Sequence, residues 1–284
     1  MTVTAFSALA CPLDGQPLQR SAGSWRCAAG HSYDIASQGY THLLPVQHKR
    51  SRDPGDSKEM VAARRRFLQA GHYESIATAV NHAFFNKIDA KAALNLLDAG
   101  CGEGYYLRQL AAATGAAQTV AGLGLDISKW AVQSAAKQAP QLNWVVGSNA
   151  RLPVLPNTLD GVLCLFGFPV YGEFARVLKG GGRLIQVDAG PEHLRQLREI
   201  IYPALKAERC GPLAPPPGFD LAHSETISYE LPIAGQSEIA DLLAMTPHLY
   251  KATAEGKARA AALTAITLTV DVRLQTFLRT GTAL

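Results

Sequence analysis

We infer the fold of this chain first from one stretch of its sequence, Leu96-Leu97-Asp98-Ala99-Gly100-Cys101-Gly102-Glu103-Gly104-Tyr105-Tyr106. Its apolar start is typical of a buried strand, and a turn with a glycine at every second position follows. Glycine lets the backbone approach a bound ligand closely because it has no side chain. The stretch therefore predicts a strand, a ligand-binding turn and a helix in succession.

Alternating strand and helix patterns continue along the chain from this point. The predicted parallel strands span 94–99, 119–126, 142–146, 161–167 and 183–189. Helices are expected at 58–70 and 73–85, after Glu103, after Ser128, through 174–178 and from Pro191 onward, with a turn at 180–182. Residues 266–275 alternate apolar with polar side chains, which predicts an antiparallel strand with one wet face and 226–233 as its partner. The expected fold is α/β, with a doubly wound sheet of seven strands whose last strand is antiparallel.

The glycine turn resembles motif I of the S-adenosylmethionine-dependent methyltransferases of class I, in which a G-x-G-x-G turn passes beneath the methionine part of the cofactor. A dinucleotide-binding fold instead carries G-x-G-x-x-G. Here the glycines stand at 100, 102 and 104, and the acidic Asp98 precedes them. The alternative is a structural turn in another α/β fold. The resemblance implies S-adenosylmethionine as the cofactor.

Two further residues are candidates for holding this cofactor. Asp126 ends the second apolar strand, where a carboxylate can accept hydrogen bonds from both hydroxyls of a ribose. Asn149 follows the third strand, in a loop that resembles the adenine-binding loop of the class and has Asn where Asp is frequent. An Asn in a loop is also ordinary turn chemistry, so this contact stays open.

Five stretches of the chain, at 43–56, 70–73, 100–106, 190–194 and 245–247, are similar to the bacterial 23S rRNA (guanine-N1)-methyltransferase family. The similarity extends over nearly the whole chain, and the first stretch is its most specific part. It implies that Tyr73, Gly102, Glu103 and His193 contact the cofactor, and that the substrate is a guanine in a hairpin of 23S rRNA. Taken alone, Tyr73 is equally compatible with a helix-start aromatic residue and His193 with a surface residue.

Residues 1–45 are expected to form a small zinc-ribbon-like module, because members of this family begin with a zinc site of the pattern C-x-x-C, then C-x-x-x-H. The corresponding residues here are Cys11, Asp14, Cys27 and His31, so a carboxylate replaces one thiolate. Zinc accepts carboxylate oxygen, and a mixed site of this kind should be more labile. The alternative is a metal-free module that packs through its apolar side chains, Trp25, Tyr33 and Ile35.

The segment between the module and the catalytic domain is basic. From Lys49 to Arg66 seven positive and three negative side chains give a charge of +4, equal to the formal net charge of the whole chain. Such a run is often a solvated surface, but beside a zinc-type module it is suited to contact RNA phosphates. We therefore expect a basic linker with helices at 46–90 and a methyltransferase domain at 91–284.

The sequence leaves the reacting groups less defined than the cofactor site. Phe166 and Phe168 follow the fourth strand, where this class holds the target base, and they can stack on a purine or pack in the core. Family relatives carry an aromatic-Ala-Pro-Cys pattern at this point, and this chain does not. The choice of the target guanine is therefore in doubt. Asp188 and His193 are candidates for the proton acceptor by location only.

Composition sets the remaining expectations. No run of about 18 apolar residues predicts a membrane span, and five cysteines are a poor basis for a secreted disulfide framework, so we expect a cytoplasmic protein. Two alternatives to an rRNA methyltransferase stay open: a small-molecule methyltransferase and a catalytically silent RNA-binding relative. The sequence does not decide the oligomeric state, and a homodimer is one alternative.

Overall fold

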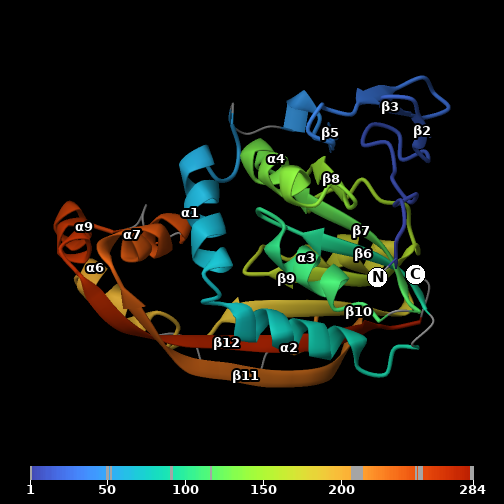
Figure 1. Ribbon diagram of the computed structural model, residues 1–284. Helices are drawn as coiled ribbons and strands as arrows, with labels where there is room; N and C mark the ends of the chain where they lie inside the picture. The colour runs from blue at the N-terminus through green and yellow to red at the C-terminus, as the bar shows by residue number, and fades with distance from the viewer. Residues whose placement is uncertain are drawn as a thin grey trace.

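A mixed nine-stranded sheet forms the centre of the computed structural model, which describes residues 2–48, 51, 53–89, 92–115, 117–205, 214–246, 248 and 252–281. The strand order is β11-β12-β10-β9-β6-β7-β8-β5, and β1 pairs with the beginning of β7 (Figure 1). The parallel centre consists of β6 (Ala93–Ala99), β7 (Thr119–Asp126), β8 (Asn143–Val146), β9 (Leu159–Leu165) and β10 (Leu178–Ala189). These are the five strands that the sequence predicts.

The antiparallel edge confirms the predicted end of the sheet. Strand β12 (Ala265–Arg279) runs antiparallel to β10, and β11 (Phe219–Ala234) runs antiparallel to β12. Two strands were not predicted: β1 (Thr2–Val3) lies parallel to β7, and β5 (Tyr40–His42) lies parallel to β8. Strands of two or three residues are too short to show an alternating pattern.

Helices cover both faces of the sheet. They are α1 (Lys58–Gln69), α2 (Glu74–Phe85), α3 (Tyr105–Ala112), α4 (Lys129–Gln138), α5 (Tyr171–Val177), α6 (Arg195–Ile201), α7 (Gln236–Met245) and α9 (Ala254–Ala261), with a 3-10 turn, η1 (Val46–His48). Helix α1 begins after Ser57, whose Oγ accepts a hydrogen bond from the Met60 N–H at 3.3 Å.

Two predictions about local structure were wrong. The helix expected from Pro191 begins only at Arg195, because residues 191–194 form a turn in which Leu194 has a left-handed φ of 52°. The glycines at 180–182 do not form a separate turn; they lie inside β10, where its pairing with β9 shifts register between Leu178 and Arg183. A bulge uses glycine for the same conformational freedom as a turn does.

Helix α1 connects two parts of the molecule. It packs against α7 on one side and α4 on the other, so it spans the space between the helices inserted near β11 and β12 and the helices over the parallel strands (Figure 1). The sequence analysis assigned no structure to α7 and α9. Among the helices in the described part of the chain, none combines the length and hydropathy that crossing a membrane requires.

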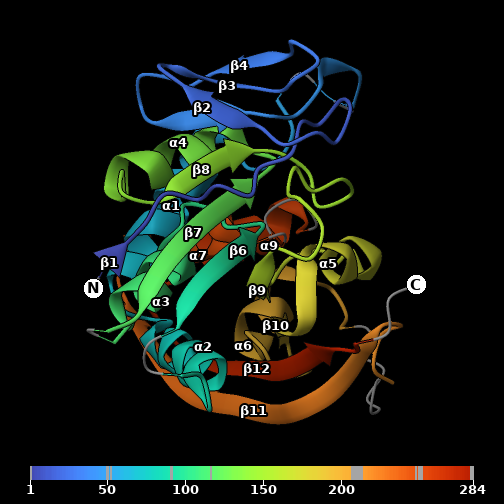
Figure 2. The ribbon, with the colours of Figure 1, turned by 90° about the vertical axis from the view of Figure 1, so that its right-hand side faces the viewer.

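The N-terminal module is a small three-stranded antiparallel sheet at one end of the molecule, made of β2 (Gln19–Ser21), β3 (Ser24–Arg26) and β4 (Ser32–Asp34) (Figure 2). It is joined to the main domain by main-chain contacts: Leu9 bridges Val154, and the Ala10 N–H donates to the Pro153 carbonyl at 2.9 Å. Trp25 is buried in the same apolar cluster as one face of the main sheet. The module is therefore packed on the main sheet.

Candidate functional site

A cavity of about 380 Å³ lies at the carboxyl ends of β6, β9 and β10, where α/β sheets bind ligands, and its size suits a small molecule. Several segments far apart in the sequence contribute to it. Its walls include Arg64, Leu68, Tyr73, Asp98, Gly100, Cys101, Gly102, Glu103, Tyr105, Tyr106, Leu165, Phe166, Gly167, Asp188, Ala189, His193, Leu194, Met245, Thr246 and His248. Most of the residues predicted to hold the cofactor are thus brought together.

The glycine turn forms the floor of this cavity. Gly100, Gly102 and Gly104 have φ values of 92°, 54° and 82°. Residues other than glycine rarely adopt this region of backbone conformation. A Cβ on Gly104 would also overlap the ring of Trp144, which is buried. Apart from Gly100 and its two chain neighbours, no atom of the described residues lies within 4 Å of where a Cβ on Gly100 would stand, so the space above that residue is open to a ligand.

Asp98 places a buried carboxylate in the cavity wall. Its side chain is almost fully covered, and its Oδ2 has no hydrogen-bond partner among the described residues. Burial raises the pKa of Asp98 to about 7, with a smaller contribution from the nearby Asp126. A buried carboxylate oxygen without a partner is costly unless a ligand pairs with it, and the ammonium of an amino acid is such a partner. This atom fits the cofactor that the sequence predicts.

Asn149 and Asp126 lie outside the cavity wall, but their geometry also fits an adenosine. The Nδ2 of Asn149 donates to the carbonyls of Ala99 and Phe168, both at 3.4 Å, which orients the amide. Its Oδ1 is buried without a partner in the described structure and can accept an amino proton such as that of adenine. Each oxygen of Asp126 accepts one backbone N–H, from Gly102 at 2.9 Å and Ser128 at 2.7 Å, which leaves one lone pair on each.

Tyr73 and His193 form a buried hydrogen-bonded pair beside the cavity. The Asp271 N–H donates to Nδ1 of His193 at 3.2 Å, and Nε2 lies 3.2 Å from the Tyr73 hydroxyl. Burial lowers the pKa of His193 to about 4, so the ring is neutral and its proton stands on Nε2, which donates to Tyr73. Because both ring nitrogens are engaged, His193 is poorly suited to be the proton acceptor and well suited to fix Tyr73.

Phe166 and Phe168 differ in their surroundings. Phe166 stacks on the rings of Tyr73 and His193, with centroids 6.0 and 5.9 Å apart, and forms part of the cavity wall. Its φ of 53° is unusual for an aromatic residue, and strain of this kind is concentrated at functional sites. Phe168 does not pack in the core, since it is 90% exposed. An exposed aromatic ring at this position can stack on a base.

Asp188 is a carboxylate of the cavity wall whose orientation is fixed by a hydrogen bond. It stands near the end of β10, and the amide of Gln186 donates to its Oδ2 at 2.6 Å. The Tyr171 hydroxyl donates in turn to Oε1 of Gln186 at 3.0 Å. This chain of hydrogen bonds fixes the Gln186 amide and, through it, the carboxylate. The sequence analysis missed Tyr171 and Gln186, because neither belongs to a motif.

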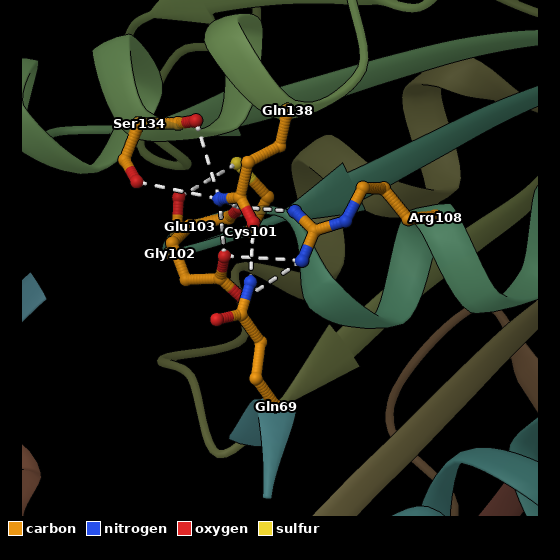
Figure 3. Close-up of polar contacts among 7 residues, drawn as sticks. All are labelled: Gln69, Cys101, Gly102, Glu103, Arg108, Ser134 and Gln138. Atoms are coloured by element: carbon orange, nitrogen blue, oxygen red, sulfur yellow. Dashed lines mark hydrogen bonds and ion pairs between the residues drawn. The ribbon is translucent and has the colours of Figure 1, made fainter. Parts of the chain in front are cut away.

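The carboxylate of Glu103 is engaged within the protein. It is fully buried and lies within 3.2 Å of the guanidinium of Arg108, while the Gln138 amide donates to it at 2.6 Å (Figure 3). Gln138 also accepts a hydrogen bond from Gln69 of α1 at 3.2 Å. These contacts stabilise the glycine turn against α3, α4 and α1. A predicted cofactor contact by Glu103 would have to come from its backbone.

The RNA contact expected of the basic run stays a prediction, and two of its arginines make contacts within the protein. Arg64 pairs with Asp56 at 2.8 Å and lines the cavity, and Arg66 makes two hydrogen bonds to Asp241 of α7, at 2.5 and 2.7 Å. Both side chains thus hold α1 in place. Lys49, Arg50 and Arg52 lie outside the described residues.

The four predicted metal ligands come together in the N-terminal module. Their ligand atoms all lie within 4.8 Å of one another, with the Asp14 Oδ2 3.0 Å from His31 Nδ1 and 3.2 Å from Cys27 Sγ. Two tight turns present them, since Gly15 and Gly30 donate to the carbonyls of Cys11 and Cys27. The Gln16 N–H holds the other Asp14 oxygen at 2.9 Å. The cluster has the ligand types and spacing that fit one tetrahedral zinc ion.

Comparison with known proteins agrees with both parts of this description. A family model described as RlmA, N-terminal, a zinc ribbon, matches residues 9–52, and a methyltransferase domain model matches residues 96–182. A protein of Micromonospora griseorubida named as a 23S rRNA (guanine-N1)-methyltransferase is 34% identical over an alignment of 296 positions. The alignment covers 94% of this chain and 95% of that protein.

Two further relatives carry similar names. YxjB of Bacillus subtilis, also named as a 23S rRNA (guanine-N1)-methyltransferase, is 30% identical over 94% of this chain and 95% of its own length. A protein of Streptomyces fradiae named 23S rRNA (guanine(748)-N1)-methyltransferase is 32% identical over 68% of this chain and 67% of its own.

The raised pKa of Asp98 predicts a pH-dependent cofactor affinity. The carboxylate must be ionised to pair with the ammonium of S-adenosylhomocysteine, so the affinity should fall about tenfold per pH unit below a pH of about 7. Asp98→Asn should bind more weakly at pH 8 and lose this dependence between pH 6 and 8. Calorimetric titration of both proteins measures the effect, and a variant that keeps the wild-type pH profile would contradict the assignment.

The mixed ligand set predicts a labile zinc ion. We expect about one zinc per chain in the purified protein, and slower release to a chelator from Asp14→Cys, because thiolate is a softer ligand than carboxylate. Asp34→Cys, which adds a thiol on the exposed end of β4, serves as the control. Zinc release at equal rates from wild type and Asp14→Cys would show that Asp14 is not a ligand.

Proposed function

This chain belongs to the 23S rRNA (guanine-N1)-methyltransferase family, and we propose on that premise that it transfers a methyl group from S-adenosylmethionine to N1 of a guanine in a 23S rRNA hairpin. The observation that carries the proposal is the buried, partnerless Oδ2 of Asp98 in a cavity at the glycine turn. Relatives over 94% of the chain supply the substrate class.

Four groups of this chain would hold the cofactor. Asp98 would pair with its ammonium, Asn149 would accept a hydrogen bond from its adenine, Asp126 would accept one from its ribose, and the glycine turn would lie against its amino-acid part. Tyr73 and His193 form a wall of the same cavity, where the hydroxyl of Tyr73 is oriented by the Nε2 proton. The bound cofactor supplies an electrophilic methyl group on a sulfonium.

The chain's own residues then have two tasks, to position the base and to accept its proton. Phe166 offers a ring whose position is fixed by its stacking on Tyr73 and His193, so a flipped purine can lie against it. Guanine N1 carries a proton that must leave as the new bond forms. Asp188, oriented by Gln186, is the carboxylate in the cavity wall that we assign to this proton.

The rest of the molecule is suited to hold RNA around the cavity. Phe168 is exposed at 90%, and Arg65 is an exposed cation on α1. The zinc-ribbon module is packed on the same domain, so it can bind a hairpin at a fixed distance from the cavity. An rRNA substrate would place the protein in the cytoplasm, and the homodimer stays a prediction for light scattering to test.

Transfer of a labelled methyl group to protein-free 23S rRNA tests the proposed function. Because a methyl group on N1 blocks the pairing edge of guanine, primer extension should stop at one new position, in a hairpin. A parallel reaction with the RNA of the small ribosomal subunit serves as the control. Methylation at another atom of the base would contradict the proposal. So would the absence of incorporation into both naked 23S rRNA and large-subunit assembly intermediates.

The role of Asp188 predicts a selective loss of rate. Asp188→Asn keeps an oxygen for the Gln186 amide but accepts no proton, so the single-turnover rate should fall by about 10² to 10⁴. The affinity for S-adenosylhomocysteine should not change, and the rate should recover at alkaline pH, where guanine N1 loses its proton to solvent. Asp220→Asn on the exposed start of β11 is the matched control. A rate loss that is independent of pH would assign Asp188 a structural role.

A further inference from the structure

Arg64 presents a guanidinium to the cavity from α1. Its Nη2 lies 2.8 Å from Oδ2 of Asp56 and donates to the Met245 carbonyl at 3.0 Å. Its Nη1 stands over the glycine turn, since a Cβ on Gly102 would be 3.1 Å from that nitrogen. The side chain is 27% exposed, which places the charge between solvent and the protein interior. The two Nη2 contacts come from segments far apart in the sequence and fix the direction of Nη1.

Arg108 pairs with Glu103, but acidic side chains outnumber basic ones in the lining of the cavity. Its walls contain the acidic residues Asp98, Glu103 and Asp188, and Arg64 is the one lysine or arginine among the described residues that line it. Two histidines also line the cavity. His193 is neutral, and His248 is 2.8 Å from the Tyr202 hydroxyl through Nδ1. If a zwitterionic ligand placed its ammonium at Asp98, Arg64 would therefore be the cation available to pair with its carboxylate.

We propose that Arg64 binds the α-carboxylate of the methionine part of S-adenosylmethionine. The inference rests on the proposed function, because it needs that cofactor in this cavity. Both charged groups border the glycine turn: Asp98 precedes it in the chain, and Arg64 covers Gly102 within it. A planar guanidinium recognises a carboxylate with two parallel hydrogen bonds, and a partly buried site strengthens them.

The segment at 53–57 keeps this guanidinium in place. Gly55 packs so closely on Ile127 and Ser128 that a Cβ there would lie 2.8 Å from the Ser128 side chain, and Ser128 Oγ donates to the Asp56 carbonyl at 2.7 Å. The backbone of Asp56 is thereby held near the end of β7, and its carboxylate pairs with Arg64, which lines the cavity. Asp56 is a positioning residue in this account, and Arg64 is the binding residue.

Binding of S-adenosylmethionine and its decarboxylated analogue, which differ in the carboxylate alone, tests the proposal by calorimetry. Wild type should prefer S-adenosylmethionine. Arg64→Met should weaken the binding of S-adenosylmethionine by about 10- to 100-fold and change the affinity for the analogue by no more than about twofold. The preference should then disappear. Arg64→Lys should keep part of the preference, and Arg65→Met, which changes an exposed neighbour on the same helix, should keep all of it.

The other outcomes are separable. Equal weakening of both ligands by Arg64→Met would show that Arg64 holds the structure and does not bind the carboxylate, and an unchanged preference would remove it from the site. Asp56→Asn should reduce the preference less than Arg64→Met does. Wild type that binds neither ligand would overturn this proposal together with the cofactor assignment, whereas a lost preference without RNA methylation would leave Arg64 assigned and reject the rRNA substrate.

Discussion

The left-handed backbone of the turn between Asp98 and Tyr105 is the constraint on which the rest of the structure depends. Three glycines with positive φ let the chain reverse at the end of β6 and begin α3, while Trp144 packs where a side chain on Gly104 would stand. The same reversal leaves the Asp98 carboxylate buried at the cavity wall. Fold and ligand site are thus consequences of one local conformation.

Helix α1 gives the cavity its second wall and links it to the remainder of the chain. Through Arg64 it contacts the turn, the linker and the end of α7, and through Arg66 it is bonded to α7 again. Tyr73, which begins α2, is fixed by His193 from the turn before α6. The cavity is therefore built from segments that the chain brings together from its whole length.

The sequence predicted those features that depend on local pattern. Alternation predicted the five parallel strands and the antiparallel β12, and the resemblance to the family implied the ligand set that includes Cys11 and Asp14. It did not predict that Glu103 would pair with Arg108, or Arg66 with Asp241, because the partner of a charged side chain is set by tertiary packing. The buried Asp271, which fixes the tautomer of His193, lies in a strand pattern that indicated a wet face.

The central claim is that the cavity at the glycine turn is the cofactor site, and a crystal structure with S-adenosylhomocysteine tests it most directly. The account predicts the ligand with its ammonium at Asp98, its carboxylate at Arg64 and its adenine at Asn149. A ligand bound elsewhere, for example in the polar hollow lined by Gln69, Arg108 and Gln138 on the other side of the turn, would contradict the account. So would a cavity that stays empty at saturating ligand.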